Sequence, residues 1–269
     1  MSKLSCFPFD KLSRVVALLT DFGERDHYVG VVKGRILQDV KGEYPHLIDI
    51  THSIPPQDVK KASLYLKFSY PYFPPGTIFL AVVDPGVGTE RKALLLISED
   101  FFFIGPDNGI FTFILKNPYV DTYEILTSKI LKPPFSSTFH ARDLFAIAVA
   151  MLLNQEPLEK WTKPISKDTL RKLSFPEPEL LPDGYKLSPW YVDHFGNIIT
   201  NLSQRDAPKS FEIWVNGKKV KLVNTYAEGK EGEVIALFGS EGLLEIAIKN
   251  DSAFKKLGYP EIVIKLKGL

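Results

Sequence analysis

The sequence predicts an α/β protein of two domains. We expect an N-terminal layered α/β domain with a mostly parallel central sheet, followed by a C-terminal all-β domain of barrel-like form. In the first part of the chain, apolar runs such as VVALLT at 15–20 alternate with periodic segments such as YVGVVKGRILQDV at 28–40, and this alternation is typical of layered α/β folds. Farther along, strand-like runs such as SFEIWVNGKKVKLV at 210–223 predominate, which favours a β-domain.

The other elements of the first domain follow from the same patterns. Strands are expected at HLIDIT (46–51), TIFLAVV (77–83), KALLLIS (92–98), FFFIG (101–105) and TYEILT (122–127), and helices at DVKKASLYLKFSY (58–70) and ARDLFAIAVAMLLN (141–154). In the second domain, Asn216-Gly217 between two apolar runs is typical of a two-residue hairpin turn.

Proline content marks the boundary between the domains. We assign residues 1–155 to the α/β domain, 156–189 to an extended interdomain connector and 190–269 to the β-domain. The prolines of the connector are Pro157, Pro164, Pro176, Pro178, Pro182 and Pro189. Proline disfavours helix at the residue before it, so this segment is expected to be extended.

Composition narrows the classes of partner. The chain of 269 residues is 45% hydrophobic and 24% charged, as in an ordinary globular protein. A formal net charge of +1 offers no basic face for nucleic acid. The single cysteine, Cys6, cannot form an internal disulfide, and no apolar run reaches the roughly 18 residues of a membrane span. Without a secretory segment, we expect a cytoplasmic protein with a small-molecule substrate.

An acidic cluster follows the first predicted strand. Asp21, Gly23, Glu24, Asp26 and His27 stand between that strand and the first helix. Ligands of α/β sheets collect at the carboxyl ends of strands, where a carboxylate such as Asp21 can accept hydrogen bonds from two vicinal hydroxyls, as on a ribose. Alternatively, Asp21 or Asp26 is simply the N-cap of the helix.

Two further segments combine residue types that suit catalysis. In AVVDPGVGTERKALLL, Asp84 ends a strand and Arg91 opens the next, so a carboxylate and a guanidinium can meet across one loop; the alternative is a surface salt bridge of little consequence. In SSTFHARDLF, His140 precedes a helix, and it is either a functional group or a structural hydrogen-bonder.

Neither a metal site nor a phosphate loop is indicated. Asp107-Asn108-Gly109 most simply forms a turn, although a ligand contact is the alternative. The possible ligands of a two-metal hydrolase are Asp21, Asp26, His27, Asp84, Asp107 and His140. Their spacing matches no metal motif, and no Gly-Lys-Ser/Thr follows DPGVGTERK. We therefore expect neither a metal nor another cofactor.

Six motifs, taken together, resemble a known family. They are LLTDFGERDHYVGVVKG, DITHSIPPQDV, VVDPGVGTERKAL, FIGPDNGIF, TFHARDLFA and VDHFGNIITNL, in this order over most of the chain. The chain resembles the adenosine-forming S-adenosyl-L-methionine (SAM) hydrolases, also called SAM hydroxide adenosyltransferases, which are relatives of the fluorinases and chlorinases. The resemblance implies an α/β domain, a barrel-like β-domain and a homotrimer with active sites at subunit interfaces.

The resemblance also implies roles for individual residues. Asp21 would bind the ribose hydroxyls, while Asp84, Arg91 and His140 would hold the attacking water or hydroxide, with the base being either Asp84 or His140. The other implied contacts lie at the two ends of the substrate. At the methionine end they are Asp193 for the amino group and Ser240 for the carboxylate, and at the adenine end they are Phe195 and Asn197.

The sequence departs from the halogenase branch of the family. Glu241 follows Ser240, where that branch has an arginine, so neutralisation of the methionine carboxylate is left open. Asp84 stands in place of an aromatic residue, Gln57 in place of a tryptophan, and Ala141 lacks a serine hydroxyl. These differences favour water over halide as the nucleophile.

The reaction implied is hydrolysis of SAM to adenosine and L-methionine. Water or hydroxide attacks the ribose 5′ carbon and methionine leaves as a neutral thioether, a good leaving group that requires no metal. The alternatives are a halogenase-type substitution and a non-catalytic SAM-binding trimeric scaffold. The presence of Asp84, Arg91 and His140 favours the hydrolase, because a scaffold has no need of a nucleophile set.

Overall fold

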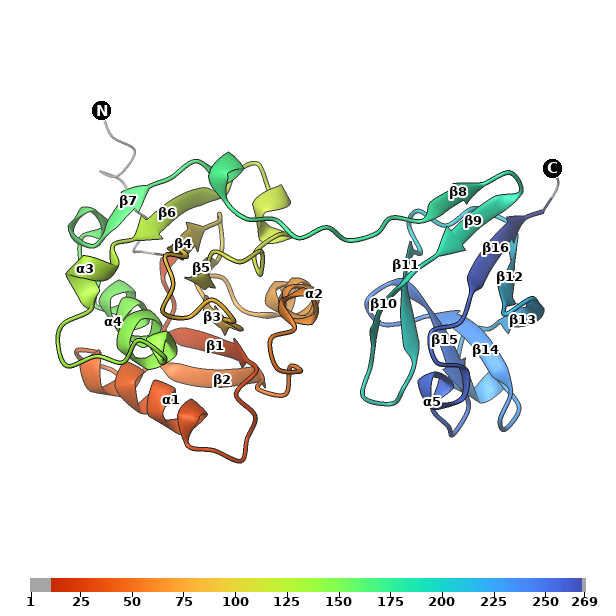
Figure 1. Cartoon of the computed structure of the whole chain (residues 1–269), viewed down its shortest axis with the longest axis horizontal. Helices are drawn as coiled ribbons and strands as arrows, with labels where there is room; N and C mark the ends of the chain where they lie inside the picture. Colours follow the sequence, from red (N-terminus) through yellow and green to blue (C-terminus); the bar gives the residue numbers. More distant parts are fainter. Residues whose placement is uncertain (1–10, 268–269) are drawn as a thin grey trace. The chain divides into compact units, whose positions relative to one another are not determined.

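The computed structural model describes residues 11–267, and Cys6 lies outside them. The chain divides into two compact units with the boundary between Leu173 and Ser174 (Figure 1). The elements of the first unit are β1 (Val15–Thr20), α1 (Tyr28–Asp39), β2 (His46–Thr51), α2 (Val59–Ser69), η3 (Tyr70–Tyr72), β3 (Ile78–Val82), β4 (Ala93–Ile97), β5 (Phe102–Pro106), η4 (Ile114–Lys116), β6 (Asp121–Ile125), α3 (Thr127–Ile130), η5 (Ala141–Phe145), α4 (Ala146–Leu153), η6 (Leu158–Lys160), β7 (Thr162–Pro164) and η7 (Lys167–Thr169).

The elements of the second unit are β8 (Glu179–Leu181), β9 (Gly184–Leu187), β10 (Pro189–Val192), β11 (Ile198–Ser203), β12 (Phe211–Val215), β13 (Lys218–Leu222), η8 (Tyr226–Glu228), β14 (Val234–Phe238), β15 (Leu243–Ile248), α5 (Ala253–Leu257) and β16 (Ile262–Leu266).

The sheet of the first unit is mixed, so the expected mostly parallel sheet is found in only half of it. The strand order is β2-β1-β3-β5-β4-β6-β7. The β2-β1, β1-β3 and β3-β5 pairs are parallel, whereas the β5-β4, β4-β6 and β6-β7 pairs are antiparallel. The reason is the short connection from β4 to β5, which is closed by a hydrogen bond from the Ser98 N–H to the Phe101 carbonyl. So short a connection makes a hairpin and cannot hold a parallel crossover.

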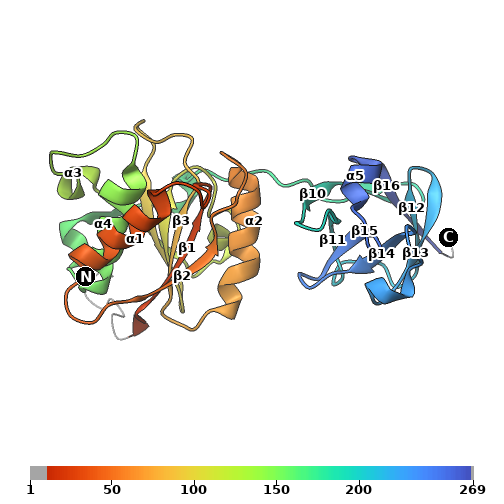
Figure 2. The same cartoon turned by 90° about the horizontal axis from the view of Figure 1, so that it is seen from below.

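Helices cover both faces of this sheet. Figure 2 shows α2 on one side and α1 and α4 on the other. In β1, Val16 and Leu18 belong to the core under α1 and α4, and Ala17 and Leu19 to the core under α2. A strand buried on both faces is apolar throughout, which is why the VVALLT run shows no alternation.

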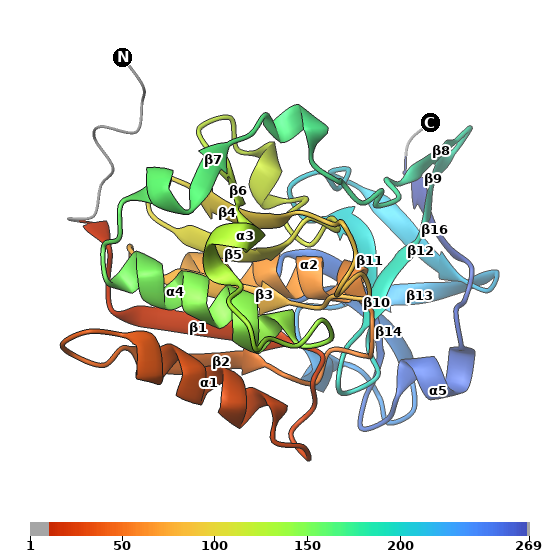
Figure 3. The same cartoon turned by 60° about the vertical axis from the view of Figure 1, so that its left-hand side comes forward.

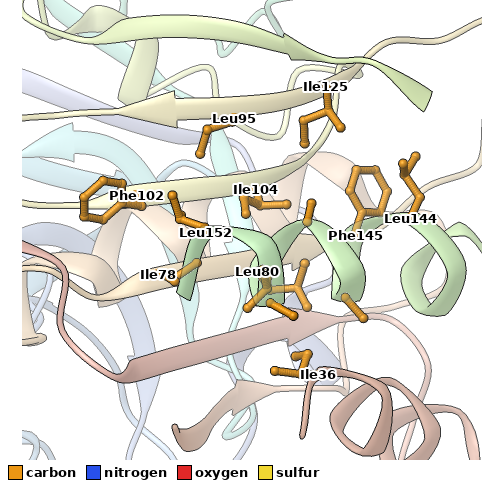
Figure 4. Close-up of a cluster of buried hydrophobic side chains, with 14 of the residues drawn as sticks. Ile36, Ile78, Leu80, Leu95, Phe102, Ile104, Ile125, Leu144, Phe145 and Leu152 are labelled. Atoms are coloured by element: carbon orange, nitrogen blue, oxygen red, sulfur yellow. The ribbon is translucent and has the colours of Figure 1, made fainter. Parts of the chain in front are cut away.

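The core under α1 and α4 is packed closely around small residues. Figure 3 shows α1 and α4 side by side across the sheet. Ala146, Ala148 and Ala150 of α4 are all buried, and such small side chains allow a close approach. Figure 4 shows Phe145 among the side chains of the sheet, including Leu80 and Ile104. The expected helix at 141–154 begins with a π-helical turn, η5, before α4.

The second unit is a curled sheet of nine strands, in the order β10-β11-β15-β14-β13-β12-β16-β9-β8. This half-barrel fits the expected barrel-like form, although α5 and η8 interrupt the β-structure. The predicted hairpin at Asn216-Gly217 is confirmed. Both residues have positive φ, 49° and 72°, and Val215 pairs with Lys218 across the turn, as a type I′ turn requires.

The segment 156–189, expected as a connector, contains regular elements of both units. Strand β7 pairs with β6 of the first sheet, while β8 and β9 join the second sheet. Trp161 is fully buried in the core under α1 and α4. Among the helices of residues 11–267, none combines the length and hydropathy that crossing a membrane requires.

We predict that Trp161→Ala destabilises the first unit by about 3–5 kcal/mol, because it removes a large side chain from a packed core. Urea denaturation measures the change in the free energy of unfolding. The control is Tyr119→Ala, at a side chain that is 80% exposed, where a change of less than about 0.5 kcal/mol is expected. Equal stability of the two variants would contradict the assignment of Trp161 to this core.

Candidate active site

Asp21 lies directly after β1, at the carboxyl end of the strand. Its Oδ2 accepts a hydrogen bond of 2.8 Å from the backbone N–H of Gln57, a residue with a φ of 67°. The N-cap of α1 is His27, and no side chain caps this helix. The alternative that Asp21 or Asp26 is an N-cap is therefore wrong. The Asp21 carboxylate is held from one side and retains acceptor capacity for a ligand.

A histidine that the sequence analysis did not single out holds the end of β1. The buried His52 makes a 2.8 Å contact from Nδ1 to the Thr20 hydroxyl, and its backbone carbonyl accepts from the Gly23 N–H. Its Nε2 lies 2.9 Å from Asp49 Oδ1. Burial raises the pKa of Asp49, but Lys33 and His52 outweigh this effect and lower it overall. His52 thus fixes the turn that carries Asp21, and the motif DITHS was the available signal.

Asp84 and Arg91 form a buried ion pair. The Nε of Arg91 donates to both carboxylate oxygens of Asp84 at 3.0 Å, and its Nη2 also donates to Oδ2. The side chain of Asp84 is only 6% exposed and that of Arg91 only 4%. The alternative of a surface salt bridge is therefore wrong. Burial makes the pairing obligatory, because either group alone would be an uncompensated charge in the interior.

His140 extends this pair into a set of three. The Nη2 of Arg91 donates to His140 Nδ1 at 3.1 Å, and the histidine is 7% exposed. Burial lowers the pKa of His140, and the positive charge of Arg91 lowers it further. The ring is therefore neutral near pH 7. Because a guanidinium can only donate, Nδ1 must accept and the ring proton must reside on Nε2.

Backbone contact brings the two loops of this set together. Gly88 has a φ of 78°, and a Cβ there would lie 2.6 Å from the carbonyl oxygen of Ser137. The loop of Ser137 is held in turn by Asp143 of η5, whose Oδ2 accepts a hydrogen bond of 2.7 Å from the Ser136 N–H. The pKa of Asp143 is lowered mainly by its hydrogen bonds from Arg142. Glycine at position 88 therefore allows the loop of Asp84 and Arg91 to reach the loop of His140.

Aromatic rings join this set to the end of β1. Phe22, next to Asp21, packs against Phe139, next to His140, with ring centroids 5.9 Å apart. Tyr28 packs on both rings, with its centroid 6.2 Å from that of Phe22 and 5.3 Å from that of Phe139. The first unit thus brings Asp21 into the neighbourhood of the buried set.

The Asp107-Asn108-Gly109 segment has a structural role, as its turn-like sequence predicts. Asp107 Oδ1 accepts from the Arg171 N–H at 2.9 Å, and Asn108 Nδ2 donates to the Val83 carbonyl at 2.7 Å. The second bond fixes the backbone immediately before Asp84. Within residues 11–267, no three or more His, Cys, Asp or Glu side chains are grouped so as to hold a metal ion.

In the second unit, Asp193 and Asn197 close the turn between β10 and β11. Asp193 accepts from the backbone N–H of Asn197 at 2.8 Å and from its Nδ2 at 2.9 Å. Phe195, at the tip of the turn, is 75% exposed, so its ring is not part of the core of the second unit. Gly196 has a φ of 86° and packs against Ser252.

A cavity of about 770 Å³ lies beside this turn. Its lining includes Phe195, Asn197, Tyr226, Ser252 and Lys255. The exposed ring of Phe195 offers a surface for stacking, and the amide of Asn197 offers polar contacts. This combination suits a planar heteroaromatic ligand.

Ser240 lies apart from the lining of that cavity. It is exposed, in the turn between β14 and β15, and is followed by Glu241. Its hydroxyl makes no hydrogen bond within the described part of the chain. The structure thus gathers Asp84, Arg91 and His140 in the first unit and Asp193, Phe195 and Asn197 in the second.

Both units of the chain match models of one known protein family. Residues 16–162 match the family description "SAM hydroxide adenosyltransferase N-terminal domain", and residues 190–261 match the corresponding C-terminal domain. A protein of Thermus thermophilus named (R)-S-adenosyl-L-methionine hydrolase is 38% identical over 92% of this chain and 97% of its own length. A protein of the same name from Methanocaldococcus jannaschii is 33% identical over 92% of this chain and 93% of its own length. A fluorinase of an Actinoplanes species is 25% identical, over 87% and 90%.

Solved structures extend the comparison to the fold. An uncharacterised conserved protein of Thermotoga maritima gives a TM-score of 0.79 at 33% identity, over 93% of this chain and 99% of that one. A conserved hypothetical protein of Thermus thermophilus gives a TM-score of 0.75 at 38% identity, over 94% of this chain and 100% of that one. The family matches cover both units of the chain, so this protein belongs to the SAM hydroxide adenosyltransferase family.

Proposed function

We propose that this protein hydrolyses SAM to adenosine and L-methionine by attack of water or hydroxide on the ribose 5′ carbon. The observation that carries the proposal is the buried set of Asp84, Arg91 and His140. Relatives that share up to 38% identity over nearly the whole chain are named for this activity.

The chemistry places its demands on the nucleophile. Methionine leaves the sulfonium centre as a neutral thioether, so its departure needs no protonation. The enzyme must instead hold a nucleophile in line with the breaking bond and away from bulk water. Hydroxide and sulfonium neutralise each other as the new bond forms, so a dry site favours the transition state over the separated charges.

The hydrogen bonds of the buried set support a division of roles. His140 accepts from Arg91 through Nδ1, so Nε2–H is its remaining polar group and acts as a donor to the nucleophile. Arg91 supplies positive charge beside the hydroxide. Asp84 is then the group that accepts a proton from water, because its carboxylate keeps acceptor capacity beyond the bonds to Arg91. We therefore assign the role of base to Asp84.

The same set favours water over halide. A halide beside Asp84 would meet a carboxylate charge, whereas water can donate a hydrogen bond to that carboxylate. The fluorinase relatives make halogenation the second candidate. In the resting set Asp84 neutralises the charge of Arg91, so an incoming halide gains little from the guanidinium. Once Asp84 has taken a proton from water, that positive charge is no longer neutralised and stabilises the hydroxide.

The ends of the substrate are assigned to the other residues of the site. Asp21 binds the ribose hydroxyls, and Asp193 takes the methionine amino group. Phe195 stacks on the adenine and Asn197 hydrogen-bonds to it. Ser240 is proposed for the methionine carboxylate through its hydroxyl. With SAM as substrate, the reaction needs no further cofactor.

We also propose a homotrimer in which the first unit of one subunit and the second unit of its neighbour share each active site. The resemblance to the family supports this arrangement. The division of the candidate residues between two units of the chain is compatible with it.

The function is tested by the origin of the 5′ oxygen. We expect the protein, incubated with SAM in oxygen-18 water and excess chloride or fluoride, to release adenosine labelled at the 5′ oxygen. Chromatography with mass spectrometry identifies the products, and protein inactivated by heat is the control. If 5′-halo-5′-deoxyadenosine were the main product, the halogenase alternative would replace the hydrolase.

The division of roles predicts two kinds of variant. His140→Ala, which keeps the buried ion pair, should lower kcat by about 10²–10³, the usual cost of losing one group that stabilises developing charge, while SAM affinity stays within threefold. Asp21→Ala should instead weaken SAM binding by about tenfold or more. Calorimetry and steady-state kinetics measure the two effects, with Asp26→Ala as the exposed control. A loss of affinity in His140→Ala as large as that in Asp21→Ala would refute this division.

A shared site predicts complementation. A His140→Ala subunit lacks a group of the first unit but keeps the buried ion pair, and an Asn197→Ala subunit lacks a group of the second. When the two inactive variants exchange subunits, some interfaces contain two intact halves, so part of the activity should return. Native mass spectrometry verifies the exchange, and each variant alone is the control. No recovery despite verified exchange would argue that each site lies within one chain.

A further inference from the structure

A buried carboxyl group in the second unit has no role in the reaction described above. Glu245 lies in β15 between Leu244 and Ile246, and it is only 4% exposed. Burial raises its pKa, and the carboxylates of Asp193 and Glu241 act in the same direction. Burying such a group is costly unless it is hydrogen-bonded, so its partner is informative.

That partner is Tyr226, a lining residue of the cavity that contains Phe195 and Asn197. The phenolic hydroxyl of Tyr226 hydrogen-bonds to Glu245 Oε1. Burial and the contact with Glu245 raise the pKa of Tyr226 beyond the physiological range. The phenol therefore keeps its proton, and Tyr226 is the donor in this bond.

The surroundings are built to hold both groups. A Cβ at Gly239 would lie 2.5 Å from Glu245 Oε2, so a glycine there leaves room for the carboxyl. At the other end, Tyr226 opens the helix η8, whose first turn is fixed by a capping box between Thr225 and Glu228. The backbone of Tyr226 and the tip of its ring are thus anchored independently.

We propose that Glu245 is a positioning residue of the substrate cavity. By accepting the phenolic hydrogen, it fixes the ring of Tyr226 as a wall beside Phe195 and Asn197. It also leaves the hydroxyl oxygen able only to accept hydrogen bonds, which suits a ligand that presents amino donors. The inference rests on the proposed function, because it takes the occupant of this cavity to be the adenosyl end of SAM, whose adenine carries an amino donor.

The test compares variants of the full chain. We expect Glu245→Leu, which removes the acceptor, and Tyr226→Phe, which removes the donor, each to raise KM for SAM and the Kd for adenosine about tenfold, with kcat within twofold. Glu245→Gln keeps an acceptor oxygen and should remain within threefold of the wild type in both constants. The double variant should lose no more than either single one, because the same bond is lost once.

Controls separate positioning from stability and from the reaction itself. Tyr259→Phe, at a ring that is 72% exposed, should leave every constant unchanged, and urea midpoints show whether each variant is folded. If Glu245→Leu does not fold, the proposal is tested by comparing the KM and Kd of Tyr226→Phe with those of the control Tyr259→Phe. Unchanged constants in Tyr226→Phe, or a loss in Glu245→Gln equal to that in Glu245→Leu, would overturn the proposal. Absence of SAM turnover by the wild type would refute the proposed function instead. The Kd for adenosine would then still test whether Glu245 positions Tyr226.

Discussion

The first unit depends on one interaction, the burial of the Arg91 guanidinium between Asp84 and His140. The guanidinium also lies over the ring of Phe145, 5.1 Å from its centroid. A buried cation is tolerated only where its partners are fixed in advance. The surrounding structure provides this: Asn108 holds the strand end before Asp84, and Asp143 holds the loop before His140. Rigidity around the set is therefore a condition of its stability as well as of its chemistry.

The sequence predicted the succession of strands and helices because burial leaves a clear periodic pattern. It also predicted the hairpin at Asn216-Gly217, where backbone geometry restricts the residue types. The antiparallel half of the first sheet was missed, although the short connection between KALLLIS and FFFIG carried the signal. Strand order depends on pairings between distant segments, and local patterns do not record them.

The site was predictable where a polar residue interrupts an apolar run, as at Asp21 and Asp84, and where a motif resembles a family. His52 and Glu245 were missed for a physical reason. Each acts through a partner elsewhere in the chain, Thr20 for His52 and Tyr226 for Glu245. The motif DITHS marks His52 as a candidate but does not name its partner, and no motif marks Glu245. The tautomer of His140 is also beyond sequence, because it follows from the direction of one hydrogen bond.

The contact between Gly88 and Ser137 has a consequence for how this protein can vary. Since the loop from Asp84 to Arg91 is positioned by its backbone, the exposed side chains of Pro85 and Glu90 are free to change. Its length is not free, because one inserted residue would displace both the glycine and the guanidinium from their partners. We therefore expect related chains to diverge in the composition of this loop while keeping its spacing.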